Sequence, residues 1–338
     1  MQPIKVWRDV TPAIFRDDIR AAAAPAVMKG LVADWPLVRA ARQGDVACVD
    51  YLRPMAIGTP VPHVRAAPEA EGRLHYGDDI RAPNFRRSSS PLADFLDALI
   101  VESGKSRPDA IAVQGLAAPE HLPEFAGANS LAIPPPSVIP RLWIGNAAKV
   151  AIHHDPSENV ACVGAGRRRF TLFPPDQVGN LYMGPFHITP AGTQVSMVHL
   201  TNPDLDRYPR FAGALDAALT AELEPGDAIY IPYQWYHHVE ALDVVNVLVN
   251  YWWDPARADV GSAWDVLMHG MMTLRNLPPD QRRAWRAMFD HYVFLSGGDP
   301  AGHLPPHARG ILGVSAPPEI AQMRRALIVK LQQAEPQR

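Results

Sequence analysis

The sequence predicts a mainly β fold with flanking helices, in which a double-stranded β-helix (a jelly roll) is followed by a helical C-terminal region. Between Arg141 and Trp253, short strand-like runs recur between Gly- and Pro-containing turns, as in sandwiches and barrels. A jelly roll is one arrangement of such strands that avoids long exposed edges. After Trp253 the apolar residues return at helical spacing. The 35 prolines and 23 glycines among 338 residues favour short elements.

The chain is expected to begin with a helix and a short strand. Thr11 suits the N-cap position of a helix, and Pro12 suits its first residue. Residues 25–31 form an apolar run that ends near glycine, which is typical of a buried strand.

A second helix is expected after residue 90. The apolar residues that follow recur at i, i+3, i+4 and i+7, which predicts a helix with one apolar face. Ser90 is the predicted N-cap of this helix, and Pro91 is its predicted first residue. Gly104 is expected to end this helix. The polar run 86–90 before it is interpreted as an exposed loop, and the Ala- and Pro-rich residues 117–141 as another loop.

The β region and the helical region define two predicted parts, residues 1–253 and residues 254–338. In the second part, Met and aromatic residues recur at helical spacing around Trp264, Trp285 and Met323. Such a stripe usually packs in a core, and it also suits the seam of a dimer.

Composition excludes several classes. The net charge is −3, whereas a nucleic-acid-binding protein usually has an excess of basic residues. Two cysteines, Cys48 and Cys162, cannot build a disulfide framework or a thiolate zinc site, so reduced thiols are expected. The N-terminus lacks the apolar run of a signal peptide, and no segment is long enough to span a bilayer. These features predict a soluble cytoplasmic protein that binds neither nucleic acid nor membrane.

The chemistry is expected to centre on His153 and Asp155. In an extended chain, alternate side chains share a face, so these two point the same way and His154 points away. An imidazole and a carboxylate on one face supply two-thirds of the two-His, one-carboxylate triad of non-haem Fe(II) oxygenases. Taken alone, the pair could equally be a structural contact. The third ligand would come from His237 or His238, in a distant strand-like run after the turn 224–227.

Several motifs in order carry a family resemblance over about residues 25–253. They are residues 25–36, the run His153-His154-Asp155, and residues 166–175, 202–209, 225–239 and 249–252. With these motifs the chain resembles the cupin-like JmjC group of Fe(II)- and 2-oxoglutarate-dependent oxygenases. Within that group it is similar to the asparaginyl hydroxylase that inhibits hypoxia-inducible factor.

The resemblance implies a set of site residues. His153, Asp155 and His237 would bind Fe(II), with His237 preferred over His238 because the family places a small apolar residue two positions after this ligand, here Val239.

For the co-substrate 2-oxoglutarate, Asn159 and Asn250 match positions whose amides contact it. Arg168 stands where relatives often have the lysine that binds its far carboxylate, and an arginine can bind that carboxylate through two hydrogen bonds. Two further positions differ from relatives, namely Val150 for a threonine and Ala112 for a tyrosine.

Three functions follow as hypotheses. The first is an Fe(II)- and 2-oxoglutarate-dependent dioxygenase that couples decarboxylation of the keto acid to succinate with hydroxylation of a protein side chain or a small molecule. The second is a metal-binding cupin-like protein whose co-substrate pocket has drifted and whose role is regulatory. A Zn- or Mn-dependent isomerase is the third, although such sites usually recruit more histidines. The C-terminal helices resemble the family's dimerisation helices in placement, so a homodimer is expected.

Overall fold

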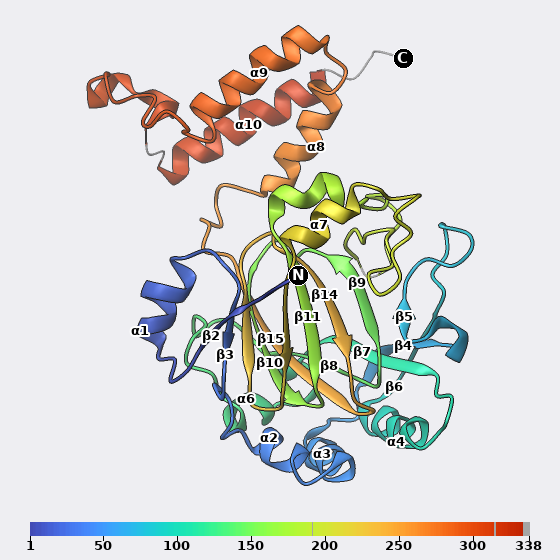
Figure 1. The fold of residues 1–338 in the computed structure, drawn as a ribbon. Coiled ribbons are helices and arrows are strands. Elements are labelled where there is room, and N and C mark those ends of the chain that lie inside the picture. The colour runs from blue at the N-terminus through green and yellow to red at the C-terminus, as the bar shows by residue number, and fades with distance from the viewer. Residues whose placement is uncertain (191, 314–315, 334–338) are drawn as a thin grey trace. The chain divides into compact units, whose positions relative to one another are not determined.

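The computed structural model of the chain describes residues 1–190, 192–313 and 316–333, and two β-sheets form the body of its first compact unit, Met1–Asp254 (Figure 1). The larger sheet has the order β2 (Lys5–Trp7), β3 (Ala26–Met28), β13 (Ala228–Ile231), β10 (Glu158–Ala165), β15 (Asn246–Trp253), β8 (Arg141–Gly145), β7 (Ala110–Ala117), β4 (Pro60–Ala66) and β6 (Arg86–Pro91). The smaller sheet has the order β1 (Gln2–Pro3), β12 (Leu219–Leu223), β11 (Arg168–Phe173), β14 (Tyr236–Ala241), β9 (Lys149–His153) and β5 (Arg73–Leu74).

Apolar side chains from both sheets meet in the barrel interior. This cluster includes Ala161, Val163, Phe170, Leu172, Leu223, Ile229, Ile231, Val239 and Leu248. Strand β10 is buried along its whole length because its alternate residues, such as Val160 and Cys162, pack into a second cluster on the outer face of the larger sheet. The predicted mainly β jelly roll with helices is confirmed.

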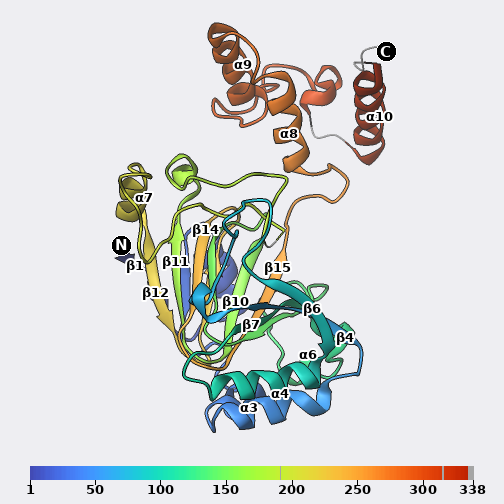
Figure 2. The same cartoon turned by 90° about the vertical axis from the view of Figure 1, so that its right-hand side faces the viewer.

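Helices cover the sheets and the ends of the barrel. They are α1 (Pro12–Ile14), which continues as a π-helical turn over Phe15–Arg20, α2 (Pro36–Ala41), α3 (Asp45–Leu52), α4 (Leu92–Ser103), α5 (Ala118–His121), α6 (Phe125–Ala128) and α7 (Phe211–Ala217). In both views, α3 and α4 lie at one end of the barrel and α7 at the other (Figure 1, Figure 2). Thr11 caps α1 as predicted, since its hydroxyl accepts from the N–H of Ile14. Among the described residues, no helix has both the length and the apolar character to cross a bilayer.

The predictions for residues 86–91 were wrong. The polar run is not a loop but strand β6, which pairs with β4 at the edge of the larger sheet while most of its side chains stay exposed. Because Pro91 still belongs to this strand, Pro91 rather than Ser90 is the N-cap of α4, and the Ser90 hydroxyl makes no cap hydrogen bond. Residues 117–141 hold the short helices α5 and α6 as well as loop.

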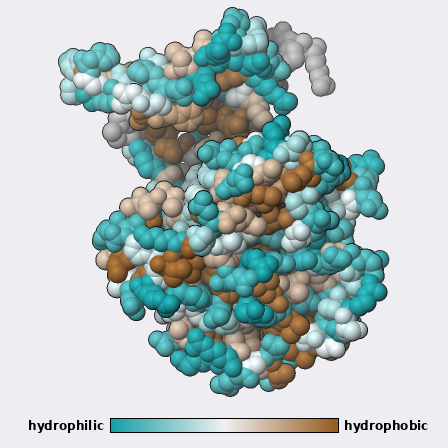
Figure 3. Space-filling model, viewed as in Figure 1, coloured by the Kyte–Doolittle hydropathy of each residue, from teal (hydrophilic) through white to brown (hydrophobic). Residues whose placement is uncertain are grey.

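The second compact unit, Pro255–Arg338, contains the helices α8 (Ala263–Thr273), α9 (Pro279–Tyr292) and α10 (Pro317–Gln333), which turns and loops connect. Ser262 caps α8 by accepting from the N–H of Trp264 at 3.1 Å. None of these three helices has a buried side chain. Large apolar residues, among them Trp285 at 45% and Leu327 at 52% exposure, therefore remain at the surface of this unit, where hydrophobic atoms are visible in Figure 3.

Candidate metal centre

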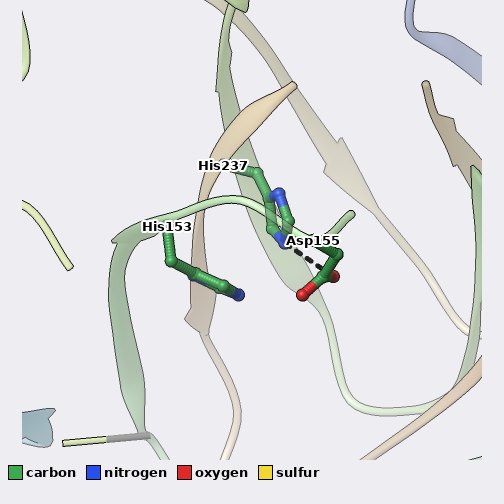
Figure 4. Close-up of side chains that lie close together, drawn as sticks. All are labelled: His153, Asp155 and His237. Carbon is green, nitrogen blue, oxygen red and sulfur yellow. Dashed lines mark ion pairs between the residues drawn. The ribbon is translucent and has the colours of Figure 1, made fainter. Parts of the chain in front are cut away.

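Three side chains converge at the end of the barrel that carries α7. One ligating atom from each of His153, Asp155 and His237 lies within 4.8 Å of the others (Figure 4). His153 ends β9 and faces His237 across the β9–β14 pair, with 4.2 Å between the ring centroids. The Nε2 atom of His237 lies 3.6 Å from Oδ2 of Asp155. Two imidazoles and one carboxylate at this spacing fit the donor set of a single metal ion.

Asp155 reaches the centre from a loop rather than from the strand. Strand β9 ends at His153, so the side-by-side placement expected from strand alternation is produced by the turn that follows. The backbone N–H of Gln234, in the turn before β14, donates to the carbonyl of Asp155 at 3.4 Å. The two segments that carry the ligands are thus joined directly.

Backbone carbonyls orient both imidazoles. The Nδ1 atom of His153 lies 2.8 Å from the carbonyl oxygen of Ala151, and that of His237 lies 3.1 Å from the carbonyl oxygen of Trp235. Because a carbonyl can only accept, each Nδ1 carries the proton and each Nε2 keeps its lone pair. This tautomer is the one that binds a metal through Nε2.

Burial keeps His237 neutral. Desolvation foremost, and then the nearby His153, lowers the pKa of His237 to about 4, while the neighbouring Asp155 acts in the opposite direction. A neutral imidazole is the form that coordinates a metal, so the ligand is ready near neutral pH.

The neighbouring histidines lie outside this cluster. The ring of His154 packs edge-on against Tyr236, with 5.0 Å between the ring centroids. His238 lines a pocket on the outer side of the smaller sheet, together with Arg73 and Lys149.

Arg168 is a buried cation in the barrel wall. It shares the face of Phe170 and Leu172, and its side chain is 7% exposed. Its neighbour Arg169 points to solvent and pairs with Glu222 and Glu240. Nε of Arg168 has no hydrogen-bond partner among the described residues, and burial lowers the pKa of this side chain to about 10.

An unpartnered buried cation is costly unless an anion joins it. The position of Arg168 therefore fits the far carboxylate of a bound keto acid.

Amide and indole groups add polar atoms to the lining of the barrel interior. The amide of Asn250 donates to Oδ1 of Asn159 at 2.9 Å, and both side chains are buried. Oδ1 of Asn250 and the indole nitrogens of Trp143 and Trp252 are buried without a hydrogen-bond partner among the described residues. The two tryptophans were not singled out from the sequence. Alternation along β15 is the signal that could have found Trp252, because it lies two positions after Asn250.

The two positions that differ from relatives, Val150 and Ala112, lie among apolar side chains. Val150 packs against the cluster in the barrel interior. Ala112 packs with Val64, Leu74 and Phe85 in a separate small cluster. Neither side chain offers a hydroxyl to a co-substrate.

A further cavity lies beside the first helix and strands β10 and β13. It has a volume of about 570 Å³ and is lined by residues that include Arg20, Glu158, Tyr230, Tyr233 and Trp235. The Tyr230 hydroxyl donates to Glu158 at 2.5 Å, and Arg20 lies 3.4 Å from the same carboxylate.

Comparison with known protein sequences identifies the family of this chain. Residues 12–259 match the family described as "Cupin-like domain". The chain is 37% identical over 132 residues to "Lysine-specific demethylase JMJ31" of Arabidopsis thaliana, and 34% identical over 151 residues to "HSPB1-associated protein 1" of Homo sapiens. These alignments cover 39% and 43% of this chain, but only 22% and 30% of those relatives.

A more extensive match is to "Bifunctional peptidase and (3S)-lysyl hydroxylase JMJD7" of Homo sapiens. The identity is 27% over 273 residues, which is 72% of this chain and 81% of that protein. Relatives named as a demethylase and a hydroxylase support an oxygenase family of JmjC type. The specific likeness to the asparaginyl hydroxylase stays a prediction.

Proposed function

The chain belongs to the family of cupin-like domains of JmjC type, and from that premise we propose that it is an Fe(II)- and 2-oxoglutarate-dependent hydroxylase. One observation carries the proposal. The His153–Asp155–His237 cluster and an unpartnered buried cation, Arg168, belong to the interior of the same barrel. A metal site alone would not require that cation, whereas a dicarboxylate spanning from metal to arginine would.

The residues have distinct roles in this proposal. His153, Asp155 and His237 would hold Fe(II) as a set of two imidazoles and one carboxylate. Arg168 binds the far carboxylate of 2-oxoglutarate, and the amides of Asn159 and Asn250 contact the same molecule. When bound, the iron and the keto acid would supply the oxidation, in which O2 and 2-oxoglutarate are consumed and a hydroxylated substrate, succinate and CO2 are formed.

The barrel wall protects this chemistry. Phe170, Leu172 and Val239 are buried apolar residues on the same inner face, and such a lining would exclude water from around Arg168. Exclusion of water strengthens the pairing of Arg168 with a carboxylate. The protein thus mainly positions the reacting groups and prevents side reactions.

The test is succinate formation and metal spectroscopy on the full chain. Anaerobic Fe(II) with 2-oxoglutarate should give a weak visible metal-to-ligand charge-transfer band, and O2 should then yield succinate. His153→Ala should lose both signals, whereas His303→Ala, an exposed site in the second unit, should keep both. Absence of the band and of succinate with every substrate class tried would refute the proposal.

A protein side chain is the first substrate class to test. Two relatives carry names that concern lysine, one a lysine-specific demethylase and one a lysyl hydroxylase. Lysine-containing peptides are therefore the first probes, followed by small molecules. Mass spectrometry distinguishes a gain of one oxygen atom from loss of a methyl group.

The alternative is a metal-binding regulatory protein without turnover. Val150 and Ala112 favour it, because they remove the hydroxyl groups that relatives offer to the co-substrate. Tight metal binding with no measurable affinity for 2-oxoglutarate would support this reading over the hydroxylase.

We further propose that the chain forms a homodimer through α8, α9 and α10. Their apolar residues lack a core within the second unit, and a second copy would cover them. The cytoplasmic location stays a prediction.

A further inference from the structure

A cluster of basic side chains lies on the outer face of the smaller sheet, apart from the barrel interior. Arg73 on β5 is the direct cross-strand partner of Lys149 on β9. Both line a small pocket with His199 and His238. Two like charges directly opposite each other on adjacent strands repel and destabilise the pairing unless an anion lies between them.

The protein does not supply that anion within the part of the chain that the structure describes. Nη2 of Arg73 is buried without a hydrogen-bond partner, and neither Arg73 nor Lys149 forms an ion pair there. Glu240 is the cross-strand neighbour of Lys149 on the other side, but its carboxylate is bonded to Arg169 at 3.0 Å.

The local field is positive. After burial itself, Arg73 and then Lys149 lower the pKa of His199, and only Glu71 opposes them. The Nδ1 atom of His199 lies 3.0 Å from the Thr201 hydroxyl, so Nε2 is the ring nitrogen that a ligand in the pocket would contact.

The shape of the pocket limits the ligand. Its volume is about 10 Å³, which is room for one water-sized group, and Ala151 and His238 form part of its wall. This volume matches a single oxygen atom of an oxyanion.

We propose that this pocket is a binding site for a small oxyanion, with Arg73 and Lys149 as its charged ligands. A phosphate or a carboxylate provides the required charge and paired acceptor oxygens. The site is separate from the proposed co-substrate pocket, where Arg168 is the cation. It nevertheless shares β9 and β14 with the metal ligands, and Ala151, one of its lining residues, supplies the carbonyl that accepts from His153.

The experiment is a titration of the full chain with inorganic phosphate, and separately with acetate, in a buffer free of other oxyanions. Isothermal calorimetry should show saturable binding of at least one probe. The tighter probe identifies a tetrahedral or a planar oxyanion as the preferred ligand. Arg73→Gln and Lys149→Gln should each weaken binding by about tenfold or more, and Arg73→Lys should restore part of it.

Two matched controls locate the site. Arg81→Gln removes an exposed arginine that is paired with Asp79 and should bind as the wild type does. Arg168→Gln separates this site from the barrel interior, because binding that is lost only in this variant belongs to the buried cation there.

Absence of saturable binding of both probes would overturn the proposal. So would wild-type affinity in folded Lys149→Gln, or loss of binding in Arg168→Gln alone. Circular dichroism of each variant verifies folding, and Lys149→Gln provides a second test if Arg73→Gln fails to fold. None of these results depends on hydroxylase activity.

Discussion

Asn250 donates its amide to Oδ1 of Asn159 at 2.9 Å, and this bond joins neighbouring strands β10 and β15 inside the barrel. The pairing leaves Oδ1 of Asn250 buried without a partner among the described residues. The two amides are therefore fixed relative to each other, while one acceptor is left over for a ligand that can donate, such as a bound water.

Asn250→Ala should destabilise the protein by about 1–3 kcal/mol, because Oδ1 of Asn159 would stay buried without its donor. Urea denaturation of the metal-free protein measures this change. Asn202→Ala, at an exposed position, should lie within about 0.5 kcal/mol of the wild type. Equal stability of the two variants would show that the bond between the amides contributes nothing.

Arg168→Gln should have opposite effects on stability and on ligand affinity. Removing a buried, unpartnered cation should leave the metal-free protein as stable as the wild type or more stable. The affinity for 2-oxoglutarate should fall by about tenfold or more, because a charge-assisted pair is lost.

The matched control for this experiment is Arg169→Gln. It removes an exposed cation with two surface ion pairs, so it should cost about 1 kcal/mol or less and leave the affinity unchanged. Ligand-dependent thermal shifts measure both quantities. A similar loss of affinity in both variants would argue against a role for Arg168 in the pocket.

Acid should destabilise the metal-free protein partly through His75. Burial first, and then the nearby Arg73, lowers the pKa of His75 to about 4, and its Nε2 lies 2.9 Å from the Ser196 carbonyl. Between about pH 6.5 and pH 4 the unfolded chain binds a proton that the folded chain does not. The free energy of unfolding therefore falls as the pH falls through this window, by about 1.4 kcal/mol per pH unit for each such histidine.

Urea denaturation at several pH values between 7 and 4.5 measures this slope. His75→Gln should reduce the slope by the contribution of one histidine, whatever its effect on stability at pH 7. His303→Gln, at an exposed position, should keep the wild-type slope. An unchanged slope in His75→Gln would mean that His75 is protonated in the folded protein.

Trp285→Glu should convert the proposed dimer to monomer. This residue lies on α9 at 45% exposure, close in helical spacing to the exposed Met288, and a charge there would have to be buried at the interface. Sedimentation velocity gives the mass of each variant. Arg283→Glu changes charge on the same helix outside the apolar stripe and should stay dimeric. A wild-type chain that is monomeric at all concentrations would contradict the proposal.

The sequence predicted the barrel well because its strands are separated by clear turn residues. Strands β8, β10, β11, β13 and β15 all lie between Arg141 and Trp253, where strand-like runs were predicted. Strand β6 was missed because an edge strand with exposed polar side chains has the composition of a loop. The cap of α4 was misplaced for the same reason, since the continuing strand holds Ser90 and Pro91 in extended backbone.

The candidate site was likewise predicted only in part. The spacing of His153 and Asp155 was informative, but the end of β9 at His153 was not anticipated. Pro156 is the available signal, because proline lacks an N–H for the ladder and restricts the residue before it. The pairing of Arg73 with Lys149 is a tertiary contact between strands 76 positions apart, and no local pattern predicts it.

The distance in sequence between the two metal-ligating histidines has a consequence for folding. His153 and His237 are 84 positions apart in the sequence, and they meet only when β14 has paired with β9. A metal ion held by both histidines and Asp155 therefore acts as a reversible crosslink that closes this long loop. Such a crosslink restricts the unfolded chain most when the loop is long, so metal occupancy should report on completed barrel closure and slow its reopening.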